Sequence, residues 1–73
     1  MLITSSFSFK KGYGQISVKD AKAIKRRIMS ALNLKGDKSW YNRLNGKVEP
    51  KVSEAEKIEQ IFKSYNITDI WGE

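Results

Sequence analysis

The sequence predicts an all-α fold, a small domain of three to four helices with a non-helical N-terminal segment. Two observations support this prediction. Apolar residues recur at spacings of three and four along three separate stretches, which is the periodicity of one buried helical face. Each stretch also carries residues that favour a helix terminus. The 73 residues form a single domain. Within it we expect an N-terminal arm or strand over residues 1–16 and a helical domain over residues 17–73.

The first predicted helix follows Ser17 and ends near Asn33. Ser17 and Asp20 resemble a capping box, in which two side chains satisfy free backbone N–H groups at a helix start. The pattern breaks at residues 34–36, which contain a glycine. The apolar face of this helix consists of Ala21, Ile24, Ile28, Ala31 and Leu32.

The second predicted helix is short, about eight residues from Asp37. Asp37 is a good N-cap, because its carboxylate can accept from the free N–H groups of the first turn. Trp40 and Leu44 are four residues apart and therefore share one face. Gly46 follows as the left-handed residue that ends a helix. So short a helix needs tertiary packing, and we expect Trp40 and Leu44 to supply it.

The third predicted helix begins at residues 53–56, Ser-Glu-Ala-Glu, which fit a capping box. We expect Asn66 to end it in the left-handed conformation. A single capped turn at residues 68–71 then places Ile70 and Trp71 on the core. The apolar stripe of the helix consists of Ile58, Ile61, Phe62 and Tyr65.

The N-terminal segment, residues 1–16, carries a weaker pattern. Phe7 and Phe9 alternate with serines, and residues 12–14, Gly-Tyr-Gly, exclude a long helix. A short strand, an arm and a disordered segment all fit this composition. Because the three capped helices begin at Ser17, we expect the protein to remain folded when residues 1–11 are deleted.

The composition excludes several classes of function. The chain has no Cys and no His, which removes the usual ligands of zinc and the usual nucleophiles and general bases. We therefore expect no enzymatic activity, metal, cofactor or small-molecule substrate. No apolar stretch approaches the ~18 residues that a membrane helix needs, so we expect no membrane partner. The absence of Cys suits a reducing compartment, and we expect a cytoplasmic location.

The charge is unevenly distributed along the chain. The formal net charge is +6. Residues 1–51 hold twelve Lys and Arg against three Asp and Glu, whereas residues 52–73 hold two against five. A basic body with an acidic end suggests one surface for a polyanion and another turned away from it.

Residues 32–67 resemble the second half of a lambda-repressor-like helix-turn-helix domain of the Cro and repressor type. The most specific part is the order and spacing of Gly46, Pro50 and Ser53. The full match consists of Leu32-Asn-Leu34, the segment Trp40 to Leu44, Gly46-Lys47, Pro50, Ser53 and the segment Ile58 to Ile67. The resemblance implies that residues 37–45 form a recognition helix and that residues 18–33 contain the helix before it. It also implies sequence-specific binding to double-stranded DNA, transcriptional regulation and a homodimer.

The candidate DNA-binding residues fall into two groups. With Trp40 and Leu44 turned inward, the second helix presents its polar residues to the major groove, where amide and cationic side chains can bond to base edges. These base-reading candidates are Lys38, Ser39, Asn42 and Arg43. The phosphate-binding candidates, from the first helix and the loop after the second, are Lys22, Lys25, Arg26, Lys47 and Lys51.

Two other functions stay open at the level of sequence. The same helical scaffold without DNA binding would be a protein-interaction module, whose basic face meets an acidic partner. RNA binding is the third alternative, with Tyr13 or Tyr41 stacking on unpaired bases.

Overall fold

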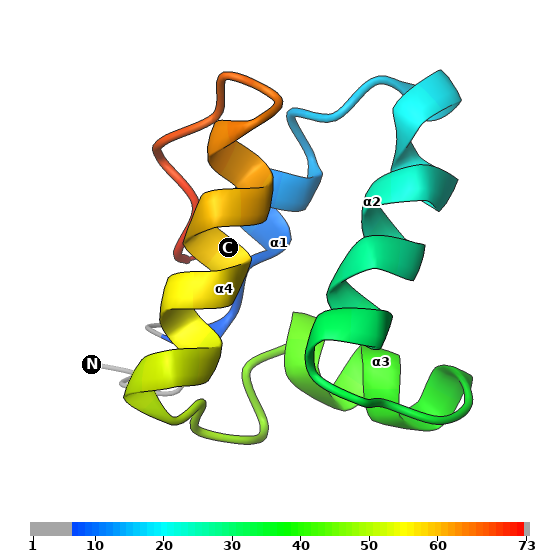
Figure 1. Cartoon of the computed structure of the whole chain (residues 1–73), viewed down its shortest axis with the longest axis vertical. Coiled ribbons are helices and arrows are strands. Elements are labelled where there is room, and N and C mark those ends of the chain that lie inside the picture. The colour runs from blue at the N-terminus through cyan, green and yellow to red at the C-terminus, as the bar shows by residue number, and fades with distance from the viewer. Residues whose placement is uncertain (1–6, 73) are drawn as a thin grey trace.

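Four helices make up most of the chain in the computed structural model, which describes residues 7–72 (Figure 1). In chain order they are α1 (Lys10–Tyr13), α2 (Val18–Ala31), α3 (Asp37–Leu44) and α4 (Val52–Lys63). These residues contain no strand, so the all-α prediction is confirmed.

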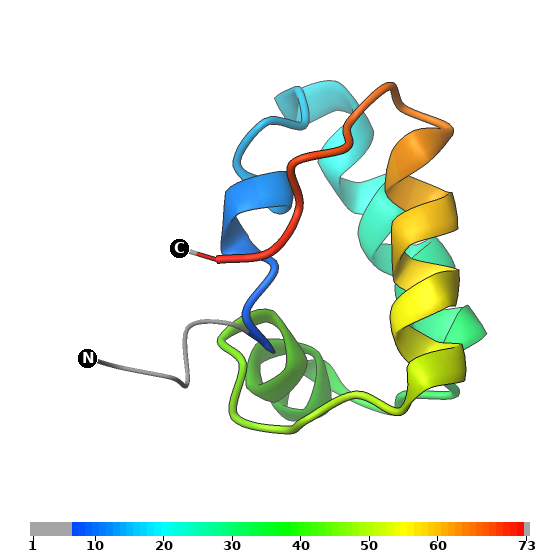
Figure 2. The same ribbon diagram turned by 90° about the vertical axis from the view of Figure 1, so that its left-hand side faces the viewer.

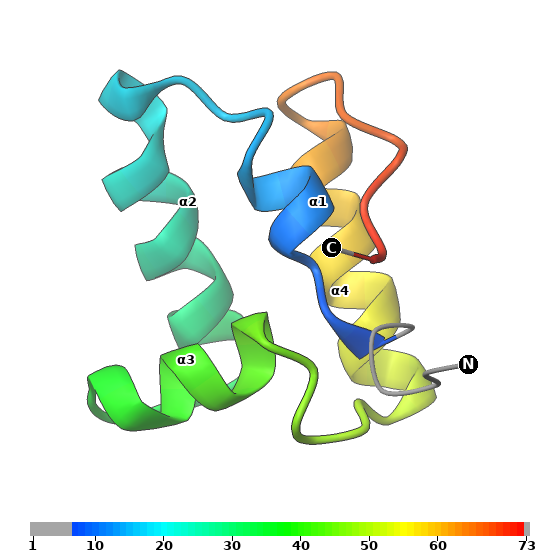
Figure 3. The same cartoon turned by 180° about the vertical axis from the view of Figure 1, so that it is seen from behind.

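The two longest helices, α2 and α4, pack against each other, and α3 lies across the end of α2 (Figure 1). Seen from behind, α1 lies between α2 and α4, and the C-terminal segment runs beside it (Figure 3). The side view shows both ends of the described chain on one side of the molecule (Figure 2). The helices thus surround a single core, and α3 forms one end of the molecule.

Phe9 lies near the centre of this core with 1% of its surface exposed. Its ring meets those of Trp40, Phe62 and Trp71 edge to face, with centroids 5.6, 6.1 and 6.2 Å apart. Such edge-to-face pairs add to the free energy gained by burying the rings. The remaining buried apolar residues are Ile24, Ile28, Leu32, Leu44, Ile58, Ile61, Ile67 and Ile70.

The three long helices, α2, α3 and α4, end in the same way. At each end a residue with positive φ is followed by one whose N–H bonds to the carbonyl five residues earlier, as in the Schellman motif. The positive-φ residues are Asn33 (56°), Gly46 (81°) and Asn66 (63°). The following N–H groups, at 34, 47 and 67, lie 2.8, 2.9 and 3.1 Å from their acceptors. The predicted helix ends at Asn33, Gly46 and Asn66 are therefore confirmed.

The helix starts agree less well with the sequence analysis. Ser17 caps α2 as predicted, with its hydroxyl accepting from the backbone N–H of Asp20. The N-cap of α3 is Gly36, not Asp37. Gly36 has φ +88°, a conformation that favours glycine, and the Asp37 carboxylate accepts from Lys25 Nζ instead.

The third long helix also starts earlier than predicted. Lys51 is the N-cap of α4, and its backbone N–H donates to the Glu54 carboxylate at 3.0 Å. The capping interaction thus joins Lys51 to Glu54, whereas the sequence analysis paired Ser53 with Glu56. Lys51, which follows Pro50, has the extended conformation of an N-cap residue, and this leaves its N–H within reach of the Glu54 side chain.

The two ends of the described chain are joined by backbone hydrogen bonds, which we call the terminal clasp: residues 8–12 against residues 70–72. The N–H of Gly12 donates to the carbonyl of Ile70, and that of Lys11 to Gly72, both at 2.9 Å. The N–H of Gly72 donates to the carbonyl of Ser8 at 2.6 Å. These bonds keep residues 68–71 from forming the predicted helical turn, although Ile70 and Trp71 do pack on the core.

The N-terminal segment also differs from the prediction for residues 1–16. Its described part, residues 7–16, contains one turn of helix and no strand. Phe9 belongs to the core, and Ser8 is fully buried with its hydroxyl donating to the carbonyl of Leu44 at 2.8 Å. Removing residues 1–11 would take out the centre of the aromatic cluster, so the expectation that this deletion leaves a folded protein is reversed. The part of the prediction concerning residues 1–6 lies outside the described residues.

Candidate nucleic-acid interface

The two faces of α3 have opposite characters. Trp40 and Leu44 are buried against the core, as the sequence predicts. Lys38 and Asn42, also four residues apart, lie on the opposite face, where Lys38 is exposed and Asn42 half-buried. Ser39 is half-buried beside them. The structure thus brings together three of the four predicted base-reading residues.

Arg43 has a different orientation from the one predicted. Its Nη1 and Nη2 lie 3.0 and 3.4 Å from the two carboxylate oxygens of Glu54, in the first turn of α4. Only 16% of the Arg43 side chain and 19% of the Glu54 side chain are exposed. The guanidinium is therefore bound in a forked pair that joins α3 to α4, and it does not project with Lys38 and Asn42.

The Arg43 pair also changes the acidity of Glu54. The hydrogen bonds from Arg43 lower the pKa of the Glu54 carboxyl below its ordinary value of 4.5, and the bond from the Lys51 N–H lowers it further. Partial burial acts in the opposite direction but is outweighed. Glu54 is thus held as a carboxylate that serves both α3 and the start of α4.

Lys25 forms the corresponding link between α2 and the start of α3. Its ammonium lies 3.2 Å from Asp37 Oδ1 and 5.7 Å from the ring centroids of both Trp40 and Tyr41. Tyr41 itself is half exposed. At the level of sequence, Tyr41 is named only as a side chain that could stack on unpaired RNA bases. The spacing of Asp37 and Tyr41, four residues apart, was the available signal that they share one flank of α3.

Basic residues lie at both ends of α3. Lys22 and Arg26 are exposed on α2 and, with Lys25 and Met29, line a shallow depression. Lys25 brings this group next to the start of α3 through Asp37. Lys47 and Lys51 are exposed in the chain that follows α3. All five predicted phosphate-binding residues therefore belong to segments that adjoin α3, and four of them are exposed.

The N-terminal segment helps to hold α3 in place. The Ser8 hydroxyl and the Phe9 N–H both donate to the carbonyl of Leu44, the last residue of α3, at 2.8 and 3.2 Å. A helix leaves its final carbonyls without partners inside the helix, and here a distant segment supplies them. Phe9 packs on Trp40 at the same place. The orientation of the candidate interface thus depends on residues far from it in sequence.

Residues 7–72 offer neither a metal site nor a membrane-spanning helix. They contain no cluster of three acidic side chains able to hold a metal ion. None of their helices has the length and apolar character that crossing a membrane requires.

Comparisons of the chain with protein-family models, curated proteins and solved structures find no significant match. The proposed function therefore rests on the geometry of α3 and its surroundings.

Proposed function

We propose that this protein binds double-stranded DNA in a sequence-specific manner and regulates transcription, in the way of the lambda-repressor-like helix-turn-helix domains that residues 32–67 resemble. The observation that carries the proposal is the two-sided character of α3. One face, with Trp40 and Leu44, is anchored in the core, and the opposite face presents Lys38 and Asn42. An anchored helix with a polar outer face has the dimensions that the major groove admits.

In this proposal the base edges are read by Asn42, Lys38 and Ser39. The Asn42 amide can offer a donor and an acceptor to an adenine, and Lys38 can donate to a guanine. Arg43, which the sequence grouped with them, is assigned another role. Its pair with Glu54 holds α3 against α4, so Arg43 positions the reading residues and does not itself read a base.

The affinity would come from lysine and arginine contacts to phosphate. Lys22 and Arg26 would contact the backbone on one side of α3, and Lys47 and Lys51 on the other. Lys25 is closer to α3, but its ammonium is already shared with Asp37. Such contacts release counterions, so the affinity falls steeply with salt.

A homodimer is part of the same proposal, because proteins of this type commonly bind two half-sites as two-fold dimers. Two segments of the chain offer apolar residues for such a contact, the N-terminal segment with Phe9 and the C-terminal end with Ile70 and Trp71. Phe9 and Ile70 are buried within the core of the single chain. Phe9 and Ile70 therefore do not supply the contact between copies.

The proposal is tested by comparing Asn42→Ala with Lys47→Ala. Asn42→Ala should relax the sequence preference by about 1–3 kcal/mol at one base position and leave the salt dependence unchanged. Lys47→Ala should weaken binding to all duplexes alike and lower the salt slope by about one. The measurement is duplex binding at several salt concentrations, with a selected site and its scrambled version.

Lys57→Ala is the matched control. Lys57 is exposed on α4, in the acidic part of the chain, and its loss should leave both quantities unchanged. Identical behaviour of the Asn42 and Lys47 variants would contradict the proposed docking. Absence of duplex binding even at low salt would instead favour the alternative, a helical protein-interaction module.

A further inference from the structure

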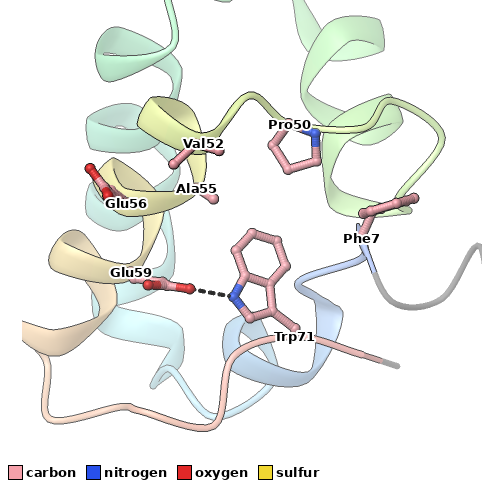
Figure 4. A pocket seen from close by; sticks show the side chains of 7 residues that line it. All are labelled: Phe7, Pro50, Val52, Ala55, Glu56, Glu59 and Trp71. Carbon is pink, nitrogen blue, oxygen red and sulfur yellow. Dashed lines mark hydrogen bonds between the residues drawn. The ribbon is translucent and has the colours of Figure 1, made fainter.

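An apolar groove lies between the start of α4 and the C-terminal end of the chain (Figure 4). The Trp71 indole lies in its middle. Val52 and Ala55 of α4 lie on one side of the indole, and Pro50 and Phe7 on the other. Four separate segments thus contribute to the groove, and all five of these residues are apolar.

The indole is fixed in position by two contacts. Its Nε1–H donates to Glu59 Oε2 at 2.9 Å, drawn as the dashed line in Figure 4. Its ring packs edge to face on Phe9. A large apolar side chain held in this way keeps its shape when a ligand arrives, which lowers the entropic cost of binding.

The groove remains open to solvent at Val52. This valine is the first residue of α4, and 77% of its surface is exposed. An isolated exposed valine needs no explanation, but here it borders a continuous apolar surface formed with Pro50, Ala55 and Trp71. Covering that surface would remove apolar area from water, which is favourable.

The charges that border the groove differ from those of the rest of the chain. Glu56 and Glu59 line it, and none of the seven described lining residues is Lys or Arg. The chain as a whole carries +6. This local acidity argues against phosphate or an anionic surface at the groove. It also argues against a two-fold contact centred there, because Glu56 and Glu59 would then approach their own copies.

We propose that the groove binds a short basic segment of a partner protein. An apolar side chain of that segment would cover Trp71, Pro50 and Val52, and a Lys or Arg beside it would pair with Glu56 or Glu59. The charge complementarity selects this occupant, since a polyanion and a second copy in two-fold contact are both disfavoured. The inference is independent of the proposed DNA binding, because the groove and the outer face of α3 share no residue.

The two tryptophans of the chain provide a direct test by NMR. Trp71 borders the groove, whereas Trp40 is buried in the core. The probe is a short synthetic peptide with a leucine–phenylalanine centre flanked by lysines, added to the full chain. A second peptide has glutamates in place of the lysines, and a third has serines in place of the apolar pair. A Trp71→Phe variant assigns the indole signals.

The lysine peptide should shift the Trp71 indole signal in a saturable way and leave the Trp40 signal unchanged. The glutamate and serine peptides should shift neither. This contrast is sharp because the net charge of the chain alone would favour the glutamate peptide. Preference for the glutamate peptide, equal shifts from all three peptides, or no shift from any of them would overturn the proposal.

Substitutions of exposed residues can locate the binding surface, because they leave the core of the domain unchanged. Val52→Ser should weaken binding of the lysine peptide about fivefold, as expected for losing about half of a valine's burial. Its matched control is Val18→Ser, because Val18 is also an exposed first residue of a helix but lies outside the groove. Unchanged affinity of the Val52 variant would overturn the proposal.

The acidic wall is tested in the same manner. Glu56→Gln should weaken binding about two- to fivefold at low salt, the effect of one exposed ion pair. Glu49→Gln removes an exposed carboxylate that does not line the groove and should have no effect.

A Trp71 shift on diluting the protein without peptide would assign the groove to a second copy. An increase in affinity on removing residues 1–6 would assign it to the chain's own N-terminus. Either result would overturn the proposal.

Discussion

The three long helices and the terminal clasp are stabilised in contrasting ways. Each long helix ends in its own left-handed residue, and α2 also begins at its own cap, Ser17. The clasp has no such local signal. It consists of hydrogen bonds between residues 8–12 and residues 70–72, which lie at opposite ends of the sequence. One part of the molecule is specified locally, and the other exists only when the whole chain has folded.

This difference bears on the candidate interface. The helical character of α3 is local, but its position is not, because Ser8 and Phe9 bond to the carbonyl of Leu44 and Phe9 packs on Trp40. Arg43 adds a link to α4. Damage to the N-terminal segment should therefore affect both the stability of the domain and the placement of the residues proposed to read DNA.

The largest expected effect is that of Phe9→Ala. Truncating a buried aromatic residue costs about 3–5 kcal/mol, which is comparable with the entire stability of so small a core. We expect this variant to lose its cooperative unfolding transition. Trp40→Ala, which truncates the neighbouring ring, should have the same effect. Circular dichroism during urea unfolding provides the measurement.

Phe9→Leu serves as the conservative comparison, because it keeps an apolar side chain and loses the aromatic pairs. It should remain folded with a lower urea midpoint. If Phe9→Ala unfolds like the parent protein, the N-terminal segment is not part of the core, and the contrast between local and distant stabilisation fails.

The next effect tests the clasp itself. In Gly12→Ala the added Cβ would lie 3.0 Å from the Cα and 3.3 Å from the carbonyl oxygen of Ile70. Overpacking of this kind costs about 1–3 kcal/mol, because the backbone of the C-terminal segment must move. Urea unfolding gives the loss of stability, and hydrogen exchange at the Gly12 and Gly72 amides shows whether the clasp opens.

Gly14→Ala is the matched control for this variant. Gly14 has an ordinary helical φ of −67° and lies outside the clasp. An added Cβ there would lie 3.2 Å from the carbonyl oxygen of Lys10, a contact within the same helical turn that leaves the C-terminal segment in place, so its substitution should cost less. Equal losses for the two variants would indicate that the close approach to Ile70 does not govern the packing of the chain ends.

A smaller effect is expected at the link between α3 and α4. Because the pKa of Glu54 is lowered in the folded state, the carboxylate stabilises the fold above its unfolded pKa, near 4.5. That stability is lost as the pH falls from about this value through the lower folded pKa. Glu54→Gln should therefore cost about 1 kcal/mol at neutral pH and progressively less in acid.

The matched variant is Glu56→Gln, which removes the same charge from a residue that forms no ion pair with the described part of the chain. Urea midpoints of the parent and both variants across this pH range provide the comparison. If the difference between the parent and Glu54→Gln is the same at every pH, the Arg43 pair does not contribute to stability in the way proposed.

The contrast also explains which features the sequence predicted. Trp40 and Leu44 follow helical spacing, and Asn66 is a residue type that tolerates positive φ, so both features can be recognised within a few residues. The burial of Phe9 depends on contacts with residues 40, 62 and 71. The single turn of α1 was not predicted because the glycines at positions 12 and 14 have low helix propensity. Local periodicity carries no information about such distant partners.

The candidate site was predictable to the same extent. Helical spacing placed Lys38 and Asn42 opposite the anchor, and the structure agrees. The same reasoning put Arg43 with them, because a helical wheel alone does not show that Glu54 lies within reach of one flank. The capping pattern at residues 53–56 is misleading for a similar reason, because the short motif does not show that Glu54 is the side chain that reaches back to Lys51.

The smallest expected effects concern the local helix ends. Asn33 and Asn66 are both exposed and both left-handed, so substituting them removes no buried contact. Alanine is strained in this conformation and should cost about 1–2 kcal/mol at either position. Glycine accepts it without strain but loses more chain entropy on folding, so Asn33→Gly and Asn66→Gly should each change the stability by about 0.5 kcal/mol or less. Because the two ends belong to different helices, the effects of the two alanine substitutions should add. Urea unfolding of the four single variants and the double alanine variant measures this directly. Strong non-additivity would mean that the ends of α2 and α4 are coupled through the core, and the helices would then be no more local in their stabilisation than the clasp.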